Sequence, residues 1–418
     1  MPNRTLNRLA SRPIVLVAGA LAACAPAGAT VPQEVPGVER AEVERLVTTL
    51  ASDEMRGRAA FTEDARRAAA FLAEEFRAAG LESPPGAEGY LQRFGVRTIS
   101  PGEATVVVNG RPLFPNQFAM RLGAGPIEWS TGDVPVIAIG AEEEPLPIVM
   151  SVANAGFDAL VLMNEQHGET FRQFVQIFRR PVRTLADAVG ATVVIALVNA
   201  EQDATYSVVA EATVEDEEGV NVVGTLPGRR ADEYVLFSAH YDHLGIERPF
   251  RGDSIANGAN DDASGTAAVV TLARHFARLG TPERTLLFAA FTGEEEGGFG
   301  SRHFSRQLDP DRIVAMFNIE MIGKVGPHGP NTAWITGFER SSFGAILQRA
   351  VEGTGYAFHP DPYPSYGLFY RSDNATLARL GVPAHSISTT PIDVDPDYHR
   401  VTDEVATLDL DHLTSTIR

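Results

Sequence analysis

The chain has 418 residues, of which 44% are hydrophobic, and its 35 basic and 54 acidic side chains give a formal net charge of −19. This length is sufficient for two or three domains with a sizeable core. A strongly negative protein repels polyanions, which argues against nucleic acid as a partner. The sequence also has no P-loop and no G-x-G-x-x-G segment, so the common nucleotide-binding classes are disfavoured.

Residues 1–23 have the layout of a secretory signal peptide. Arg4, Arg8 and Arg12 precede an apolar stretch that is too short to cross a membrane as a helix. The stretch ends in Leu-Ala-Ala-Cys, which is similar to the lipobox of bacterial lipoproteins, and Cys24 is the only cysteine of the chain. A single cysteine forms no internal disulfide, so we expect Cys24 to carry a lipid that anchors the protein to a membrane.

A lipid on Cys24 predicts an exported protein of the cell envelope. Ala25 follows the cysteine, and no aspartate does, which resembles lipoproteins that are sorted to an outer membrane and face the periplasm. The alternative is ordinary cleavage after Ala27 or Ala29. No second long apolar run occurs, so nothing beyond the signal is expected to span a bilayer. Residues 24–38 are expected to form a linker.

Short elements follow in the first half of the chain. Apolar side chains at helical spacing predict helices at 41–50 and 62–80, with Gly80 as the stop signal. From 100 to 212 the pattern changes, and these residues predict an inserted domain that is small α/β or β-rich. Its expected strands are 105–108, 134–139, 159–162 and 191–198, and its expected helix is 147–155.

Longer elements return in the second half of the chain. Residues 234–239 and 285–291 are near-continuous apolar runs of strand length, as buried parallel strands are. Residues 264–279, ended by Gly280, predict a helix. The sequence therefore predicts an α/β fold, a three-layer sandwich with a mostly parallel central sheet. The last residues have a helical pattern that we expect to run beyond Arg418.

Histidines and carboxylates cluster in five segments, most of them directly after a predicted strand. The segments are SAHYDH (238–243), GANDDASG (258–265), FTGEEEGG (291–298), NIEMIG (318–323) and DYHRVTD (397–403). Ligands of open α/β sheets gather at the carboxyl ends of the strands. Zinc accepts His nitrogens and carboxylate oxygens, and two zinc ions are held best by a shared carboxylate. The segments offer Glu294 as a proton carrier and five metal ligands: His240, Asp261, Glu295, Glu320 and His399.

These segments resemble the zinc exopeptidases of peptidase family twenty-eight, over roughly residues 217–418 and more weakly over 39–95. The resemblance implies a peptidase domain built from 39–99 and 213–418, with two Zn²⁺ ions and peptide substrates. It also implies that His240 and Glu320 bind the first zinc, that Glu295 and His399 bind the second, and that Asp261 bridges them. Glu320 departs from the family pattern, which has an aspartate one methylene shorter.

Three further residues receive roles from the resemblance. Asp242 would orient His240, and Glu294 would act as the general base that later protonates the leaving amine. Tyr398 would donate to the oxyanion, although a simply packed aromatic residue is the alternative. The segment SDEMRGR resembles a family segment whose arginine lies near the substrate cleft. ANAGFDALVLMNEQ resembles the protease-associated domain, with an unrelated small α/β insertion as the alternative.

Charge favours an aminopeptidase among the reactions of this family. The motif segments contain uncompensated acids that would attract a substrate ammonium group and repel a carboxylate: Asp242, Asp262, Glu294 and Glu296. Arg371 and Arg400 favour a carboxypeptidase instead, because either could bind a C-terminal carboxylate. A glutaminyl cyclase that works with one zinc and a catalytically silent binding homologue are the remaining alternatives.

Overall fold

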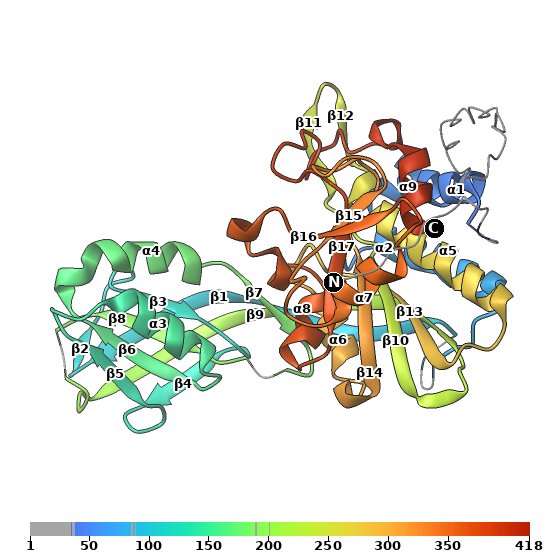
Figure 1. Cartoon of the computed structure of the whole chain (residues 1–418). Coiled ribbons are helices and arrows are strands. Elements are labelled where there is room, and N and C mark those ends of the chain that lie inside the picture. Colours follow the sequence, from blue (N-terminus) through green and yellow to red (C-terminus); the bar gives the residue numbers. More distant parts are fainter. Residues whose placement is uncertain (1–34, 36–37, 85–86, 88, 189, 200) are drawn as a thin grey trace, which may run out of the picture. The chain divides into compact units, whose positions relative to one another are not determined.

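A computed structural model describes residues 35, 38–84, 87, 89–188, 190–199 and 201–418 (Figure 1). The predicted signal peptide and Cys24 lie outside the described residues. Across the ranges that are described, no helix is both long and apolar enough to cross a membrane. The helices are α1 (Arg40–Leu50), α2 (Glu63–Ala79), α3 (Pro145–Asn154), α4 (Gly168–Phe178), α5 (Ser264–Leu279), α6 (Phe299–Ser305), α7 (Phe343–Ala350), α8 (Asn374–Arg379) and α9 (Leu410–Ile417).

Within the described residues, an eleven-stranded mixed sheet forms the centre of the fold (Figure 1). Its strand order is β16 (Ala357–Pro360), β15 (Thr332–Ile335), β17 (Ala384–Ser388), β14 (Ile313–Ile319), β10 (Arg230–His240), β13 (Arg284–Phe291), β9 (Tyr206–Leu226), β1 (Leu91–Val108) and β2 (Arg111–Pro112). Two more strands join at the side, β4 (Ile127–Ser130) on β9 and β7 (Val182–Leu185) on β1.

The predicted α/β fold is confirmed, but the sheet is mixed rather than mostly parallel. Strands β13, β10, β14 and β17 are parallel to one another, as their apolar runs predict. In contrast, β9 is antiparallel to β13, and β1 is antiparallel to β9. The physical reason is that β1 and β9 are the two strands of one long ribbon, so the chain leaves along one and returns along the other.

Helices cover both faces of the parallel strands. Side chains of a strand alternate between faces, so Phe237 of β10 packs against Phe276 of α5, with ring centroids 5.4 Å apart. On the opposite face, the neighbouring Leu236 belongs to a buried cluster with Phe304 of α6 and Leu377 of α8. The helix ends follow the sequence signals, since Thr62 caps α2 and Gly80 ends it with a positive φ of 80°.

A second sheet lies in the middle of the chain, with the strand order β3 (Phe118–Arg121), β8 (Val193–Leu197), β6 (Ala159–Met163) and β5 (Val136–Ile139). Buried clusters lie on both of its faces. Leu160 and Leu162 belong to one cluster and Val161 to the other, which includes phenylalanines of α4. Residues 100 and 212, the predicted limits of the inserted domain, lie inside β1 and β9, which pair continuously apart from one irregularity at 101–104.

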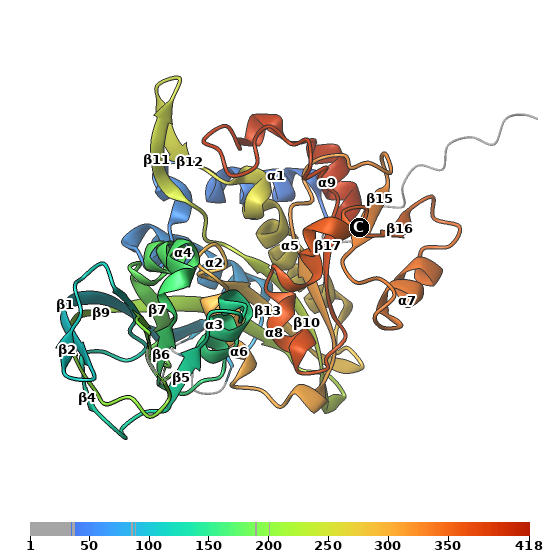
Figure 2. The same cartoon turned by 90° about the vertical axis from the view of Figure 1, so that its left-hand side faces the viewer.

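A hairpin of β11 (Gly245–Phe250) and β12 (Asp253–Ala256) follows the first metal-site segment along the chain and stands out in Figure 2. Its base contacts the short helical segment Asp53–Arg58. The guanidinium of Arg58 is fully buried and donates to the main-chain oxygens of Leu50, Tyr241, Asn257 and Gly258, at 2.5 to 3.0 Å. Arg58 therefore links the end of α1 to the main chain around Tyr241 and Asn257–Gly258, next to two of the metal-site segments.

Candidate metal centre

The parallel strands bring the predicted ligands to one edge of the sheet. His240 is the last residue of β10 and lies beside Phe291, the last residue of β13. β13 leads into Glu294 and Glu295 three and four residues later, and β14 leads directly into Glu320. Since carboxyl ends of parallel strands meet at the same edge, these side chains converge.

Asp261 lies at the centre of the group, with its two carboxylate oxygens facing different histidines. Its Oδ1 is 3.2 Å from Nε2 of His240, and its Oδ2 is 3.3 Å from Nε2 of His399. The main-chain N–H groups of Asn260 and Asp261 both donate to the buried carboxylate of Asp403. This fixes the turn, and the carboxylate of Asp261 is only slightly exposed.

Two sets of ligand atoms surround Asp261. In the first set, Oε1 of Glu320 is 3.2 Å from Nε2 of His240. In the second set, Oε2 of Glu295 is 3.1 Å from Nε2 of His399. A zinc tetrahedron with bonds of about 2.0–2.1 Å has edges between ligand atoms of roughly 3.3–3.4 Å. Both sets have a spacing close to that of such an edge, so the geometry of each set suits the binding of a metal ion.

Buried negative charge supports the same conclusion. Asp242, Asp261 and Asp262 are buried within the described structure, and Glu294, Glu295 and Glu320 are at most partly exposed. Burial raises the pKa of Asp242 to about 6, although the nearby His240 lowers it. Buried carboxylates are stable only when they are paired or coordinate metals. The donor set therefore suits divalent cations.

His243 is a histidine of the site that the sequence analysis missed. Its side chain is fully buried, and its Nδ1 is 2.8 Å from Oε1 of Glu295. Donor atoms of His243, Asp261 and Glu295 all lie within 4.8 Å of one another. The family pattern assigns no role to the third residue after His240. The only signal was a second histidine in the same post-strand segment.

Asp242 makes a different contact from the predicted one. Its carboxylate is 3.8 Å from Nδ1 of His240, whereas its main-chain oxygen is 3.1 Å from that nitrogen. The carboxylate instead accepts from the main-chain N–H groups of Glu294 and Glu295, at 3.3 and 3.4 Å. The backbone of Asp242 thus orients His240, and its side chain holds the loop that carries both glutamates.

Glu320 reaches the first set through one oxygen. Its Oε1 faces His240, and its Oε2 accepts from the hydroxyl of Ser372 at 2.6 Å. The amide of Asn318 donates to the same hydroxyl at 2.7 Å, so Ser372 is itself held in place. The extra methylene of Glu320 is accommodated in this way, with one oxygen left for a metal.

The loop that carries Tyr398 and His399 is anchored by Lys324. The ammonium group of Lys324 contacts Asp395 at 2.6 Å and Asp397 at 2.9 Å. His399 has a positive φ of 54° and a side chain that is 40% exposed, so it lies at the mouth of the site. Tyr398 stacks on His399, with ring centroids 4.0 Å apart. Burial, together with nearby carboxylates, raises the pKa of Tyr398, so the phenol keeps its proton.

Glu294 lies in the same cavity as the proposed ligands and has a raised pKa. It lines the same cavity as Asp261, Glu295 and Glu320. Burial is the main cause that raises its pKa, and the charge of Glu320 adds to the effect, against the opposing influence of His240. A carboxylate with a raised pKa takes up a proton more readily near neutral pH.

The cavity next to the ligands has a volume of about 270 Å³. Its lining includes three glutamates and His399 together with four apolar residues, Met321, Trp334, Leu368 and Ile392. Arg371 also lines the cavity, whereas Arg400 and Arg58 do not. The arginine of SDEMRGR at position 58 is therefore internal, because its guanidinium is taken up by main-chain oxygens.

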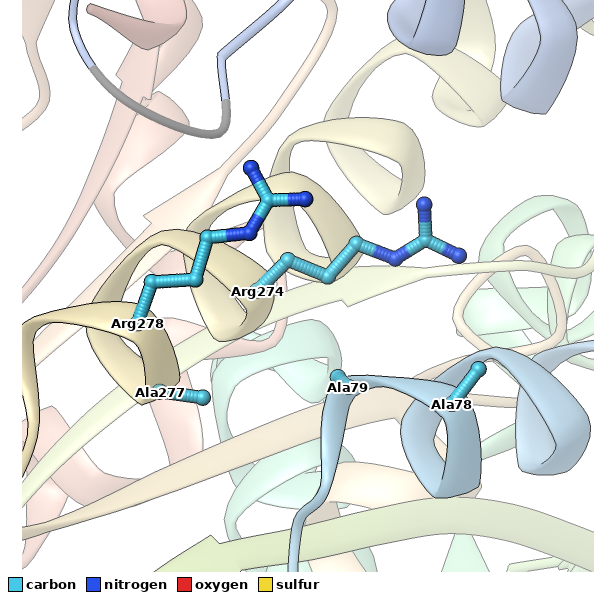
Figure 3. A pocket seen from close by; sticks show the side chains of 5 residues that line it. All are labelled: Ala78, Ala79, Arg274, Ala277 and Arg278. Atoms are coloured by element: carbon cyan, nitrogen blue, oxygen red, sulfur yellow. The ribbon is translucent and has the colours of Figure 1, made fainter.

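A second hollow lies between α2 and α5, and the described residues that line it are alanines and arginines rather than histidines and carboxylates. Figure 3 shows Arg274 and Arg278 extending from successive turns of α5 beside Ala78 and Ala79 of α2. Arg274 forms ion pairs with Glu42 and Glu75, so its charge is already compensated. This hollow has a volume of about 360 Å³, which exceeds that of the cavity beside the proposed ligands, but the described residues that line it include no metal ligand.

Residues 221–418, which contain all five predicted ligands, match the family described as peptidase family M28. This part of the chain belongs to peptidase family M28. The chain is 28% identical over 204 residues to leucine aminopeptidase 1 of Trichophyton rubrum, covering 46% of this chain and 54% of that protein. It is 40% identical over 106 residues to a probable zinc metalloprotease of Pyrenophora teres f. teres, covering 24% and 22% of the two chains.

Solved structures share the fold of this chain over most of its length. An aminopeptidase from Aneurinibacillus sp. strain AM-1 matches with a TM-score of 0.54 and 16% identity, over 92% of each chain. A zinc aminopeptidase from Bacillus subtilis matches with a TM-score of 0.53 and 17% identity, over 92% of this chain and 94% of its own. The chain spans about half the length of the leucine aminopeptidases that it matches.

Proposed function

We propose that this protein is a two-zinc exopeptidase, and that it acts as an aminopeptidase on peptides with a free amino terminus. The observation that carries the proposal is Asp261, whose two oxygens face two separate sets of ligand atoms. The curated relatives named leucine aminopeptidase and zinc metalloprotease support it. His240 and Glu320 would hold one zinc, and Glu295 and His399 the other.

The residues of the chain divide the reaction between them. When bound, two zinc ions would acidify a water molecule held between them and polarise the substrate carbonyl. Glu294 lines the cavity together with Asp261 and would take the proton of the attacking water, then deliver it to the departing amine. Tyr398, whose phenol stays protonated, would donate to the oxygen of the tetrahedral intermediate. The apolar residues that line the cavity would contact an apolar side chain on the amino-terminal residue of the substrate.

Charge supports recognition of a substrate ammonium group. Glu294, Glu295 and Glu320 line the cavity together with Asp261, so an incoming amine meets a negative surface. One observation favours a carboxypeptidase as the second candidate: Arg371 lines the same cavity and could pair with a C-terminal carboxylate. A glutaminyl cyclase and a silent homologue are less well supported, because both ligand sets and Glu294 are present.

The deciding experiment compares blocked and unblocked peptides. We expect hydrolysis of leucyl arylamides and free-amine dipeptides, and loss of cleavage when the amine is acetylated. If acetylation leaves cleavage unchanged while C-terminal amidation abolishes it, the carboxypeptidase replaces the aminopeptidase. Metal analysis that finds at most one tightly held ion in zinc-replete protein would contradict the two-zinc assignment.

We also propose that the protein is lipidated on Cys24 and faces the periplasm from an outer membrane. The lipobox-like sequence before Cys24 supports this. We expect globomycin-sensitive processing and a lipid mass on Cys24, and release of Cys24→Ala into the soluble fraction. Unchanged membrane partitioning of that variant would contradict the anchor.

A further inference from the structure

We infer that His243 is a positioning residue for Glu295, the glutamate proposed to bind the second zinc. This inference rests on the proposed function and deepens it. Nδ1 of His243 is 2.8 Å from Oε1 of Glu295, while Oε2 of the same carboxylate is 3.1 Å from His399. An ionised carboxylate only accepts hydrogen bonds, so Nδ1 carries the proton and donates it to Oε1. His243 thereby keeps Oε2 turned towards the second metal position.

The ring of His243 is held rigidly enough to act in this way. It is fully buried, and a Cβ added to Gly258 would lie 2.5 Å from its Cγ, so the ring lies directly on the glycine backbone. The main-chain N–H of His243 donates to the main-chain oxygen of Arg58. Nε2 is buried and has no hydrogen-bond partner among the described residues. The contact with Glu295 is therefore the polar contact that sets the ring orientation.

Distance distinguishes this role from direct ligation. Oε1 of Glu295 is 2.8 Å from His243, which is an ordinary hydrogen-bond length and shorter than the roughly 3.3 Å edge of a zinc tetrahedron. The four contacts between neighbouring atoms of the five proposed ligands measure 3.1 to 3.3 Å. His243 therefore matches a hydrogen-bond donor behind the ligand Glu295.

The first metal set has the same arrangement with different residues. Ser372 donates to Oε2 of Glu320 at 2.6 Å and leaves Oε1 facing His240 at 3.2 Å. Each glutamate ligand thus has one oxygen held by a donor and one oxygen turned to a histidine ligand. Hydrogen-bond partners of metal ligands typically contribute about 10–100-fold to metal affinity.

The test measures zinc binding in the absence of substrate, on the full-length protein and on two variants of position 243. The two variants place a side-chain amide N–H at different positions. In His243→Asn the amide overlaps Nδ1 and can still donate to Glu295. In His243→Gln it reaches the position of Nε2 instead. Competition with a chromophoric chelator gives the two zinc dissociation constants, and Glu295→Gln identifies which constant belongs to the second site.

We expect His243→Gln to weaken the second zinc by about 10–100-fold and the first by less than about threefold. His243→Asn should stay within about threefold of the wild-type protein at both sites. His243→Leu should behave like the Gln variant and replaces it if that variant does not fold, as judged by circular dichroism. His412→Gln, which changes another buried histidine in α9, is the matched control and should alter neither constant.

Equal losses in the Asn and Gln variants would overturn the inference, since they would indicate packing or direct ligation. Unchanged constants in the Gln and Leu variants, or equal weakening of both sites, would also overturn it. The proposed function is separable from this result. If the variants bind zinc as expected but the protein cleaves no peptide, only the proposed function is contradicted. If the protein cleaves peptides but His243→Gln leaves both zinc dissociation constants unchanged, only the role of His243 is contradicted.

Discussion

Within one side chain of this site, individual oxygen atoms make different contacts. Asp261 gives one oxygen to each ligand set, and Glu320 gives one oxygen to the metal position and the other to Ser372. Composition alone does not contain this information, because every carboxylate has two equivalent oxygens. The backbone turn and the neighbouring donors decide which oxygen faces the metal.

Glu294→Gln should abolish most turnover while both metals remain bound. The substitution keeps the shape of the side chain and removes its ability to accept a proton, a contribution of roughly 10²–10⁴-fold. We expect the loss in kcat, with KM little changed, in assays on leucyl arylamides alongside metal analysis. The matched control is Glu169→Gln on exposed α4, which should keep the wild-type rate. A Glu294→Gln enzyme with most of its activity would assign the base to another residue.

Much of the site was predictable at this scale, and the reasons for the misses are physical. His240 and the pair Glu294–Glu295 follow apolar runs of strand length, which is where strand ends place side chains, whereas Asp261 and His399 lie in loops and were named from their motifs. His243 escaped prediction because burial and contact with Glu295 arise only from folding. The contact of Asp242 also differed, because its carboxylate is drawn to two N–H groups of a loop some fifty residues away, and no local pattern encodes that choice.

At the scale of elements, the loop between β13 and α6 is held from two sides. Asp242 accepts from its main chain, and Arg183 of β7 contacts Glu296 at 2.8 Å and Glu217 of β9 at 3.1 Å. The guanidinium of Arg183 also lies over the ring of Phe61, 5.1 Å from its centroid. A strand that lies in the chain between β6 and β8, two strands of the four-stranded sheet, therefore contacts the loop that carries the proposed base.

Arg183→Ala should lower kcat by about two- to fivefold and leave the melting temperature nearly unchanged. Half-exposed ion pairs contribute at most about 1 kcal/mol, so the expected effect is on the position of the loop rather than on folding. Arg97→Ala is the matched control, because Arg97 pairs with Asp216 on the same ribbon and has no contact with the loop. The double variant with Arg183→Glu and Glu296→Arg should recover part of the rate. An equal loss in Arg97→Ala would contradict a specific role of Arg183.

Element prediction succeeded where a segment carries its own signal. The helix at 62–80 has a cap, a period and a glycine stop, and the structure confirms it as α2. By contrast, β9 runs for 21 residues through the acidic stretch 215–218, which no strand pattern indicates. Its conformation there comes from pairing with β1, where Val96 faces Glu217 and Arg97 faces Asp216. The mixed direction of the sheet was hidden for the same reason, since the direction of β1 and β9 follows from their pairing and not from apolar runs of their own.

At the scale of the whole molecule, metal removal should lower stability markedly. The protein has a net charge of −19, and a group of carboxylates is buried around Asp261. Ions that bind only the folded state stabilise it by about 4 kcal/mol at a thousandfold excess over the dissociation constant. We therefore expect chelation of zinc to lower the melting temperature by several degrees, and added zinc to restore it. Calorimetry with and without chelator checks this, and identical melting curves would contradict it.

Because β1 and β9 are paired, the residues between them could be removed without changing the order of the remaining strands. Thr98 and Glu215 are paired across the ribbon, and paired strands lie only about 4.8 Å apart. A tight turn could join these two points and delete everything between them without rethreading the remaining strands. The shortened enzyme would keep every proposed ligand, but Arg183 would be gone with the deleted residues.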